Sequence, residues 1–164
     1  MPIEHRTTLR TSKDSELIAI FGPLAFILRA NGEIVVGDQV TDLRLDQGKV
    51  LVVAAPGSYT VETAIASIVL RSQNEHKGVG FYLEAQEWLT YFCADYGIAE
   101  ISVKDDPLIN TVTSASHHDR PVYFYRDEIR KKRIKNAPFK NHTDGELKLL
   151  GELIGHVPPF MQQE

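Results

Sequence analysis

Two closely spaced glycines, Gly78 and Gly80, are the feature of the sequence that most directly suggests a chemistry. They follow a polar stretch, residues 71–77, and precede a stretch with helical periodicity. Glycines at the start of a helix let the backbone approach a ligand closely, and the first amides of the helix favour an anion such as a pyrophosphate. The alternative is that both glycines only turn the chain, because so short a motif has low specificity.

The segments around this 78–80 loop predict a β-loop-α-β unit. Residues 64–70 form a short apolar run with β-branched side chains, which indicates a strand buried on both faces. After the loop, apolar side chains recur at helical spacing, namely Phe81, Ala85, Trp88, Leu89, Phe92 and Tyr96. Gly97 is expected to cap this helix, and residues 98–103 to form the next strand. Crossovers of this kind join parallel strands.

His117, His118 and Asp119 form the one dense cluster of potential metal ligands in the sequence. Adjacent histidines point to opposite sides of a strand and diverge by about 100° on a helix, so they are poor joint ligands. The remaining histidines stand in no recognised metal-binding spacing: His5, His76, His142 and His156. We therefore predict a polar loop here and assign no metal ligands.

Six basic residues fall within ten positions: Arg126, Arg130, Lys131, Lys132, Arg133 and Lys135. Because Tyr123 and Tyr125 precede them, this basic patch could bind single-stranded nucleic acid by charge and stacking. Asp127 and Glu128 interrupt the positive charge, which favours the alternative of a solvated, charged helix face.

The composition is that of a globular protein. At 164 residues, with 43% hydrophobic and 24% charged residues, the chain fits one domain, which we place at residues 1–155, followed by a short tail at 156–164. The net charge of −4 gives no overall attraction to nucleic acid or to an anionic membrane. The single cysteine, Cys93, is expected to pack within the predicted helix and gives no sign of an oxidising compartment. No apolar run has the length of a signal-peptide core or a membrane span, so we expect a cytoplasmic protein.

The rest of the chain completes an α+β prediction. Residues 15–21 predict a helix, and the segments 24–28, 33–37, 41–45 and 49–55 predict an antiparallel meander with a hairpin turn at Asn31-Gly32. Residues 121–125 predict a strand. A last helix is expected to begin after His142-Thr143-Asp144, with one apolar face formed by Leu147, Leu150, Leu153 and Ile154. The predicted fold is a mixed, largely antiparallel central sheet with flanking helices.

This order of elements resembles the GCN5-related N-acetyltransferase family, most clearly across residues 64–105. In that family the loop reads Arg or Gln, two residues, Gly, one residue, then Gly or Ala, and its amides hold the pyrophosphate of acetyl-CoA. The corresponding stretch here is Glu75-His76-Lys77-Gly78-Val79-Gly80. Glu75 replaces the family's Arg or Gln, and Lys77 could offset its charge.

The resemblance implies acetyl-CoA-dependent transfer of an acetyl group to an amine of a small molecule or a protein. It assigns cofactor binding to Val69, Leu70, Arg71, Lys77, Gly78, Val79, Gly80 and Phe81. Attack of the amine on the thioester needs a base, for which Glu62 is the candidate by position. Tyr123 is the candidate acid for the departing thiolate. The alternative roles are a solvated carboxylate at a strand end for Glu62 and a sheet aromatic for Tyr123.

Two hypotheses of another class stay open. One is a non-enzymatic binding or regulatory protein, directed to nucleic acid by the basic patch and able to form a homodimer. The other takes residues 24–70 as part of a β-barrel-like module that senses a small molecule, with the later helices used for dimerisation. In that case the 78–80 loop is purely structural.

Overall fold

The computed structural model describes residues 6–37, 42–126 and 133–161, and strands dominate them. The strands are β1 (Thr7–Arg10), β2 (Leu17–Phe21), β3 (Leu24–Leu28), β4 (Glu33–Val36), β5 (Asp42–Ala54), β6 (Ser58–Glu62), β7 (Ala66–Arg71), β8 (Val79–Ala85), β9 (Leu89–Val103), β10 (Asp106–Ala115), β11 (Val122–Tyr125) and β12 (Ile134–Asn136). The described residues contain one α-helix, α1 (Asp144–Ile154), and a short 3-10 helix, η1 (Pro159–Met161). The α+β prediction is therefore wrong, because the fold is mostly β.

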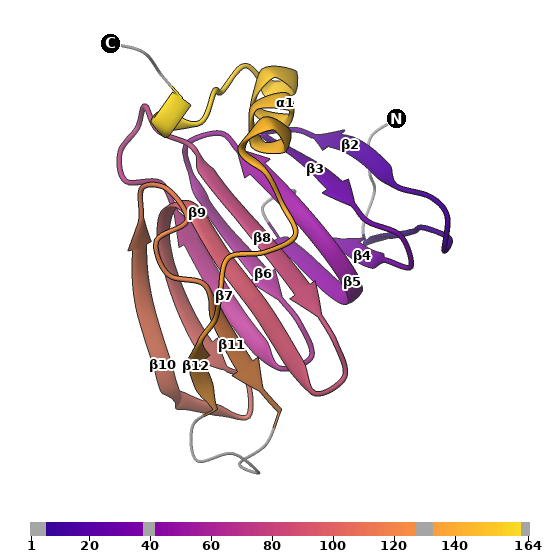
Figure 1. Ribbon diagram of the computed structural model, residues 1–164, viewed down its shortest axis with the longest axis vertical. Helices are drawn as coiled ribbons and strands as arrows, with labels where there is room; N and C mark the ends of the chain where they lie inside the picture. The colour runs from indigo at the N-terminus through magenta and orange to yellow at the C-terminus, as the bar shows by residue number, and fades with distance from the viewer. Residues whose placement is uncertain (1–5, 38–41, 127–132, 162–164) are drawn as a thin grey trace.

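Two long strands, β5 and β9, join two sheets into a closed barrel (Figure 1). The first part of β5 pairs with β4 and β6, and its second part pairs with β3 and β8. Likewise β9 pairs first with β8 and β11, and then with β7 and β10. The ring β5-β6-β7-β9-β8 closes on itself, and all of its pairs are antiparallel except β5 with β6.

Gly97 lies where β9 changes partners. Tyr96 is the last β9 residue paired with β8, and Ile98 is the first paired with β7. Gly97 has φ of +113°, a conformation that side-chain-bearing residues rarely adopt. The predicted helix cap is therefore wrong, and the glycine instead permits the bend that carries β9 from one sheet into the other.

The second sheet has the order β2-β3-β5-β8-β9-β11-β12, and its strands β3 and β8 are buried on both faces. Phe81, Leu83 and Phe92 point into the barrel core. Tyr82, Tyr91 and Cys93 alternate with them and point outward into a second apolar cluster, which Leu147 and Leu150 of α1 complete. The helix contacts β3 and β5 and lies across this outer face (Figure 1). One sheet thus separates the barrel core from a smaller core beneath α1.

This double burial explains why the predicted helix at 81–96 is wrong. These residues form most of β8 and the first half of β9, joined by a turn at 86–88. Strands with one wet face alternate apolar and polar residues, whereas strands covered on both faces read as continuous apolar runs. The apolar residues of β8 and β9 therefore happen to satisfy a helical spacing.

Three other local predictions also fail. Residues 15–21 do not form a helix, because β2 occupies most of that stretch. The segments 64–70 and 98–103 were expected to run parallel, but β7 and β9 pair antiparallel. The turn at Asn31-Gly32 does not make a hairpin, because β3 and β4 both pair with β5, in different sheets. The predicted strand at 121–125 is confirmed in β11, and the last helix is confirmed in α1.

Candidate functional site

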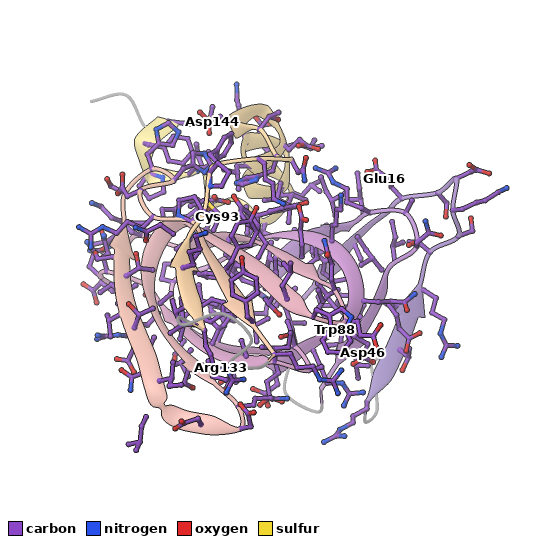
Figure 2. The ribbon with its side chains drawn as sticks, turned by 60° about the horizontal axis from the view of Figure 1, so that its bottom comes forward. Glu16, Asp46, Trp88, Cys93, Arg133 and Asp144 are labelled. Atoms are coloured by element: carbon purple, nitrogen blue, oxygen red, sulfur yellow. The ribbon has the colours of Figure 1, made fainter. Side chains whose placement is uncertain are left out.

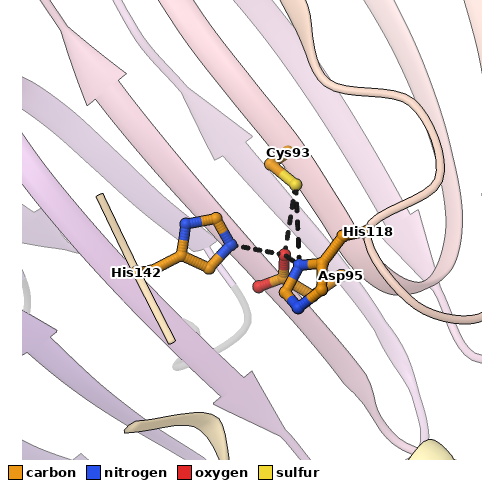
Figure 3. A group of neighbouring side chains, drawn as sticks. All are labelled: Cys93, Asp95, His118 and His142. Atoms are coloured by element: carbon orange, nitrogen blue, oxygen red, sulfur yellow. Dashed lines mark hydrogen bonds and ion pairs between the residues drawn. The ribbon is translucent and has the colours of Figure 1, made fainter. Parts of the chain in front are cut away.

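A cluster of titratable side chains lies on the outer face of the second sheet, next to the start of α1. Asp95 is at its centre, and Cys93 lies two residues before it on β9, so both side chains point to the same face. His118 comes from the turn after β10, where its φ of 57° and a 3.0 Å hydrogen bond from its backbone N–H to the Asp95 carbonyl fix its position. His142 comes from the segment that leads into α1. Figure 3 shows these four side chains converging; we call them the Asp95 cluster.

One oxygen of the Asp95 carboxylate contacts each of the other three side chains of the cluster. Asp95 Oδ1 lies 2.6 Å from His118 Nδ1, 2.8 Å from His142 Nε2 and 3.2 Å from Cys93 Sγ. The other oxygen, Oδ2, is buried and has no hydrogen-bond partner among the described residues. An unpaired buried carboxylate oxygen is costly, so its presence marks the cluster as more than a packing feature.

A second layer of acceptors and rings surrounds the two histidines. His118 Nε2 lies 2.7 Å from Asp144 Oδ1, and His142 Nδ1 donates to the Lys140 carbonyl at 2.8 Å. Tyr82 stacks on the His142 ring with centroids 4.5 Å apart, and Phe139 lies 4.6 Å from both histidine rings. One nitrogen of each ring is thus fixed by an acceptor outside the cluster, and the other nitrogen, His118 Nδ1 or His142 Nε2, faces Asp95.

The electrostatics of the cluster follow from this arrangement. Burial opposes the charge of Asp95, but hydrogen bonds from His118 and His142 hold its pKa below the usual range. Burial also opposes a charged His118, yet Asp95 and Asp144 together raise the pKa of His118. Burial, with the adjacent Asp95 charge, raises the pKa of the Cys93 thiol. The thiol is therefore protonated at neutral pH and is not an activated nucleophile.

The donor atoms of Cys93, Asp95, His118 and His142 all lie within 4.8 Å of one another. The sequence had suggested neither Cys93 nor Asp95 for this role, and it had grouped His118 with Asp119. The structure separates that pair, since Asp119 accepts from the backbone N–H of Ser116 at 2.8 Å. The usable signal was the Cys-x-Asp spacing, which on a strand places both side chains on one face.

The residues assigned to acetyl-CoA do not surround a helix N-terminus. Val69, Leu70 and Arg71 lie on β7; Lys77 and Gly78 precede β8, and Val79, Gly80 and Phe81 open it. A Cβ on Gly80 would lie closer than 3.0 Å to the Tyr96 ring, so this glycine permits close packing between strands. The helix-dipole argument for a pyrophosphate therefore does not apply, and acetyl-CoA binding itself stays a prediction.

The two predicted catalytic residues lie on different sheets. Glu62 ends β6, where its carboxylate lies 3.6 Å from Lys104 Nζ. Tyr123 lies on β11, and its ring packs edge-on against Tyr91 with centroids 5.5 Å apart. Both placements match the structural alternatives, a carboxylate at a strand end and a sheet aromatic.

Of the six basic residues in the patch, the structure describes Arg126, Arg133 and Lys135. Arg133 is buried: it donates to the carbonyls of Tyr125 and Arg126 and lies 2.8 Å from Asp105. Arg126 lies over the Trp88 ring at 5.6 Å, and Lys135 is on β12. Arg130, Lys131 and Lys132 lie outside the described residues. Figure 2 shows Arg133 and Trp88 toward one end of the barrel and Asp144 toward the other.

The chain thus has a mostly β, barrel-centred fold with one helix on its outer face, and comparisons with known proteins agree with this class. No protein-family model matches the sequence, and no curated protein matches it significantly. Two solved structures share the fold, both described as a putative anti-sigma factor from Parabacteroides distasonis. Their TM-scores are 0.64 and 0.62 at 10% and 11% identity, covering 89% and 90% of this chain.

This chain spans 65% and 64% of those two chains, which is less than two thirds of their length. At such low identity the likeness establishes the fold alone. It is enough to show that the acetyltransferase resemblance is wrong, because a barrel replaces the predicted α/β unit. Among the described residues, no helix has the length and apolar character needed to cross a membrane.

Proposed function

We propose that this chain is a non-enzymatic regulatory module that acts by binding a protein partner. The observation that carries the proposal is the fold it shares with two structures described as anti-sigma factors, across 89% and 90% of this chain. An anti-sigma factor is, by its name, a protein that acts on another protein. A regulatory protein was also the alternative to catalysis that the sequence left open.

The described element best suited to receive a partner is β2. It pairs with β3 on one side, and no described strand pairs with its other side. Its residues, LIAIF, include neither a charge nor a proline, and Ile18 and Ile20 are 50% and 52% exposed. Native proteins usually protect an open edge strand with charges or proline, so an unprotected apolar edge favours addition of a partner strand.

The other open edges among the described strands are protected in this way. β1 contains Arg10, β12 contains Lys135, and β10 contains Asp106. β2 is therefore the edge that we assign to the partner. The expected occupant is an extended segment of a protein, with alternate apolar side chains against Ile18 and Ile20.

An open pocket next to β2 offers polar anchors for the same segment. It has a volume of about 720 Å³ and is lined by residues that include Glu16, Arg29, Lys49 and Glu146. Arg29 lies between two carboxylates there, 3.1 Å from Glu16 and 2.6 Å from Glu146. Main-chain pairing along β2 would supply affinity, and these charges would supply selectivity.

Site-specific photo-cross-linking in the native organism tests this proposal. A photoreactive residue at position 20 on β2 should give one discrete adduct with a single protein. The same residue at position 112 on β10, where Val112 is 59% exposed, should give none. Sigma factors of the same organism are the first candidates for direct binding measurements. Ile20→Lys should weaken binding of the purified partner by about tenfold or more, because a charge would be buried in the interface.

The proposal fails if position 20 gives no adduct, or if positions 20 and 112 give the same adducts in equal yield. It also fails if the purified partner binds the Ile20→Lys variant as tightly as the unaltered chain, provided that the variant keeps its melting temperature. A matched control is Ile18→Val, which keeps the edge apolar and should keep most of the affinity.

A further inference from the structure

We propose that Cys93, Asp95, His118 and His142 form a four-ligand site for a divalent transition-metal ion of the zinc class. The ion would fasten the segment that enters α1 to strand β9. This inference is independent of the proposed partner, because it rests on the Asp95 cluster alone.

The donor set and its spacing suit such an ion. A thiolate, two imidazoles and a carboxylate are ligands that zinc takes in tetrahedral sites, where neighbouring donors lie about 3.3–3.7 Å apart. Cys93 Sγ lies 3.2 Å from Asp95 Oδ1 and 3.9 Å from His118 Nδ1, on either side of that range. The two ring nitrogens lie closer to Asp95, so the carboxylate would have to withdraw by about 1 Å to admit the ion.

The orientation of the histidine rings is the strongest argument. His142 Nδ1 faces the Lys140 carbonyl, which can only accept, so Nδ1 carries a proton, and in the neutral form of the ring the Nε2 lone pair would point toward Asp95. His118 Nε2 faces Asp144 in the same way, so in the neutral form of this ring the Nδ1 lone pair would also point toward Asp95. Metal-ligating histidines almost always donate their other N–H to a carbonyl or a carboxylate. Both rings therefore have the orientation of metal ligands, with a cation between them and Asp95 accepting the two lone pairs.

A metal ion would also balance the charge of the ligands in this buried site. The side chains of Asp95 and His142 are both 0% exposed. One thiolate and one carboxylate carry two negative charges, so a divalent ion makes the site neutral and avoids burying net charge. Asp95 Oδ2, buried without a partner among the described residues, offers a second oxygen to the ion.

The surroundings indicate a structural ion. All four ligands come from the protein, and the rings of Tyr82 and Phe139 cover the histidines, which is the closed arrangement of structural zinc sites. The ligands come from β9, from the turn after β10 and from the segment before α1. The ion would therefore hold α1 against the sheet by connecting parts of the chain that are distant in sequence.

Metal analysis of the full chain, purified with zinc and without a histidine tag, provides the test. We expect about one zinc ion per chain after desalting. Cobalt(II) in its place should give a thiolate-to-metal charge-transfer band, which must come from Cys93 because the chain has 1 cysteine. Zinc at about a thousandfold excess over its dissociation constant should raise the melting temperature by about 8–16 °C relative to chelator-treated protein.

Variants separate this site from adventitious binding by surface histidines. Cys93→Ser should lose the charge-transfer band, and both Cys93→Ser and His142→Gln should retain less than about 0.1 zinc per chain. His117→Gln is the matched control: His117 contacts Asp144 from outside the ligand set, so this variant should keep about one zinc.

Absence of bound zinc in the unaltered chain, with no change in melting temperature on zinc addition, would overturn the proposal. Zinc bound equally well by Cys93→Ser would overturn it too. If Cys93→Ser does not fold, the cobalt spectrum of the unaltered chain decides the question.

Discussion

Replacing Gly80 with alanine tests why a glycine stands at this position. A Cβ there would lie closer than 3.0 Å to three atoms of the Tyr96 ring. That ring is 2% exposed and packs against Phe160 with centroids 5.9 Å apart, so it has little room to move away. Overpacking of a core costs about 1–3 kcal/mol, and 1 kcal/mol corresponds to about 2–4 °C for a chain of this length. Gly80→Ala should therefore lower the melting temperature by about 4–8 °C, for a mid-range cost of about 2 kcal/mol.

Two controls make the test decisive. Gly145→Ala lies in the first turn of α1, where the nearest atom to the new Cβ is 3.8 Å away, and it should be neutral or stabilise by up to about 1 kcal/mol. Tyr96→Val removes the clashing ring atoms, so in that background Gly80→Ala should cost less than about 0.5 kcal/mol in urea unfolding. Equal costs in both backgrounds, or no cost in the unaltered chain, would refute close packing as the reason for Gly80.

Two further predictions concern the contacts of Arg29 and Arg133. Through its hydrogen bond and its charge, Arg29 holds the pKa of Glu146 below the usual range. The pair therefore stabilises the fold at pH values above the pKa of Glu146 in the unfolded chain, about 4.3. This stabilisation is lost as the pH falls through the lower pKa of Glu146 in the folded chain. In melting curves between pH 7 and 3, the advantage of the unaltered chain over Glu146→Gln should shrink below about pH 4.5; a constant difference would contradict the pairing. Arg133→Met should lower the free energy of unfolding in urea by about 1–3 kcal/mol, because it leaves carbonyls unpaired. Lys135→Met, on the exposed part of β12, should change it by less than about 0.5 kcal/mol, and equal effects would contradict a structural role for Arg133.

The parts of the fold that the sequence predicted are those decided by neighbouring residues. The start of α1 is an example: the Thr143 side chain accepts from the backbone N–H of Glu146, and the Glu146 side chain accepts from the backbone N–H of Thr143. This capping box lies within four residues and needs no tertiary contact. The strand β11 was likewise evident from its aromatic and β-branched residues.

The parts of the fold that the sequence did not predict depend on contacts between segments that are distant in the chain. No local pattern shows that β5 and β9 each serve two sheets, so one strand was divided at Gly48 and another was interpreted partly as a helix. The Asp95 cluster shows the same limit. Asp95 and His142 are separated by 47 positions and meet only because the segment before α1 crosses the outer face of the sheet.

The segment before α1 and the helix itself connect these observations. By covering the outer face, they bury Tyr82 and Cys93 on the side of β8 and β9 that water would otherwise contact, and this removes the alternation that marks a strand. The same covering segment carries His142 to Asp95. The proposed ion would thus stabilise the docking of α1 on the sheet. This docking matters because an 11-residue helix is only marginally stable alone and owes its stability to packing. A ligand at His142, two residues before Asp144, would hold the first turn of that helix in register with β9.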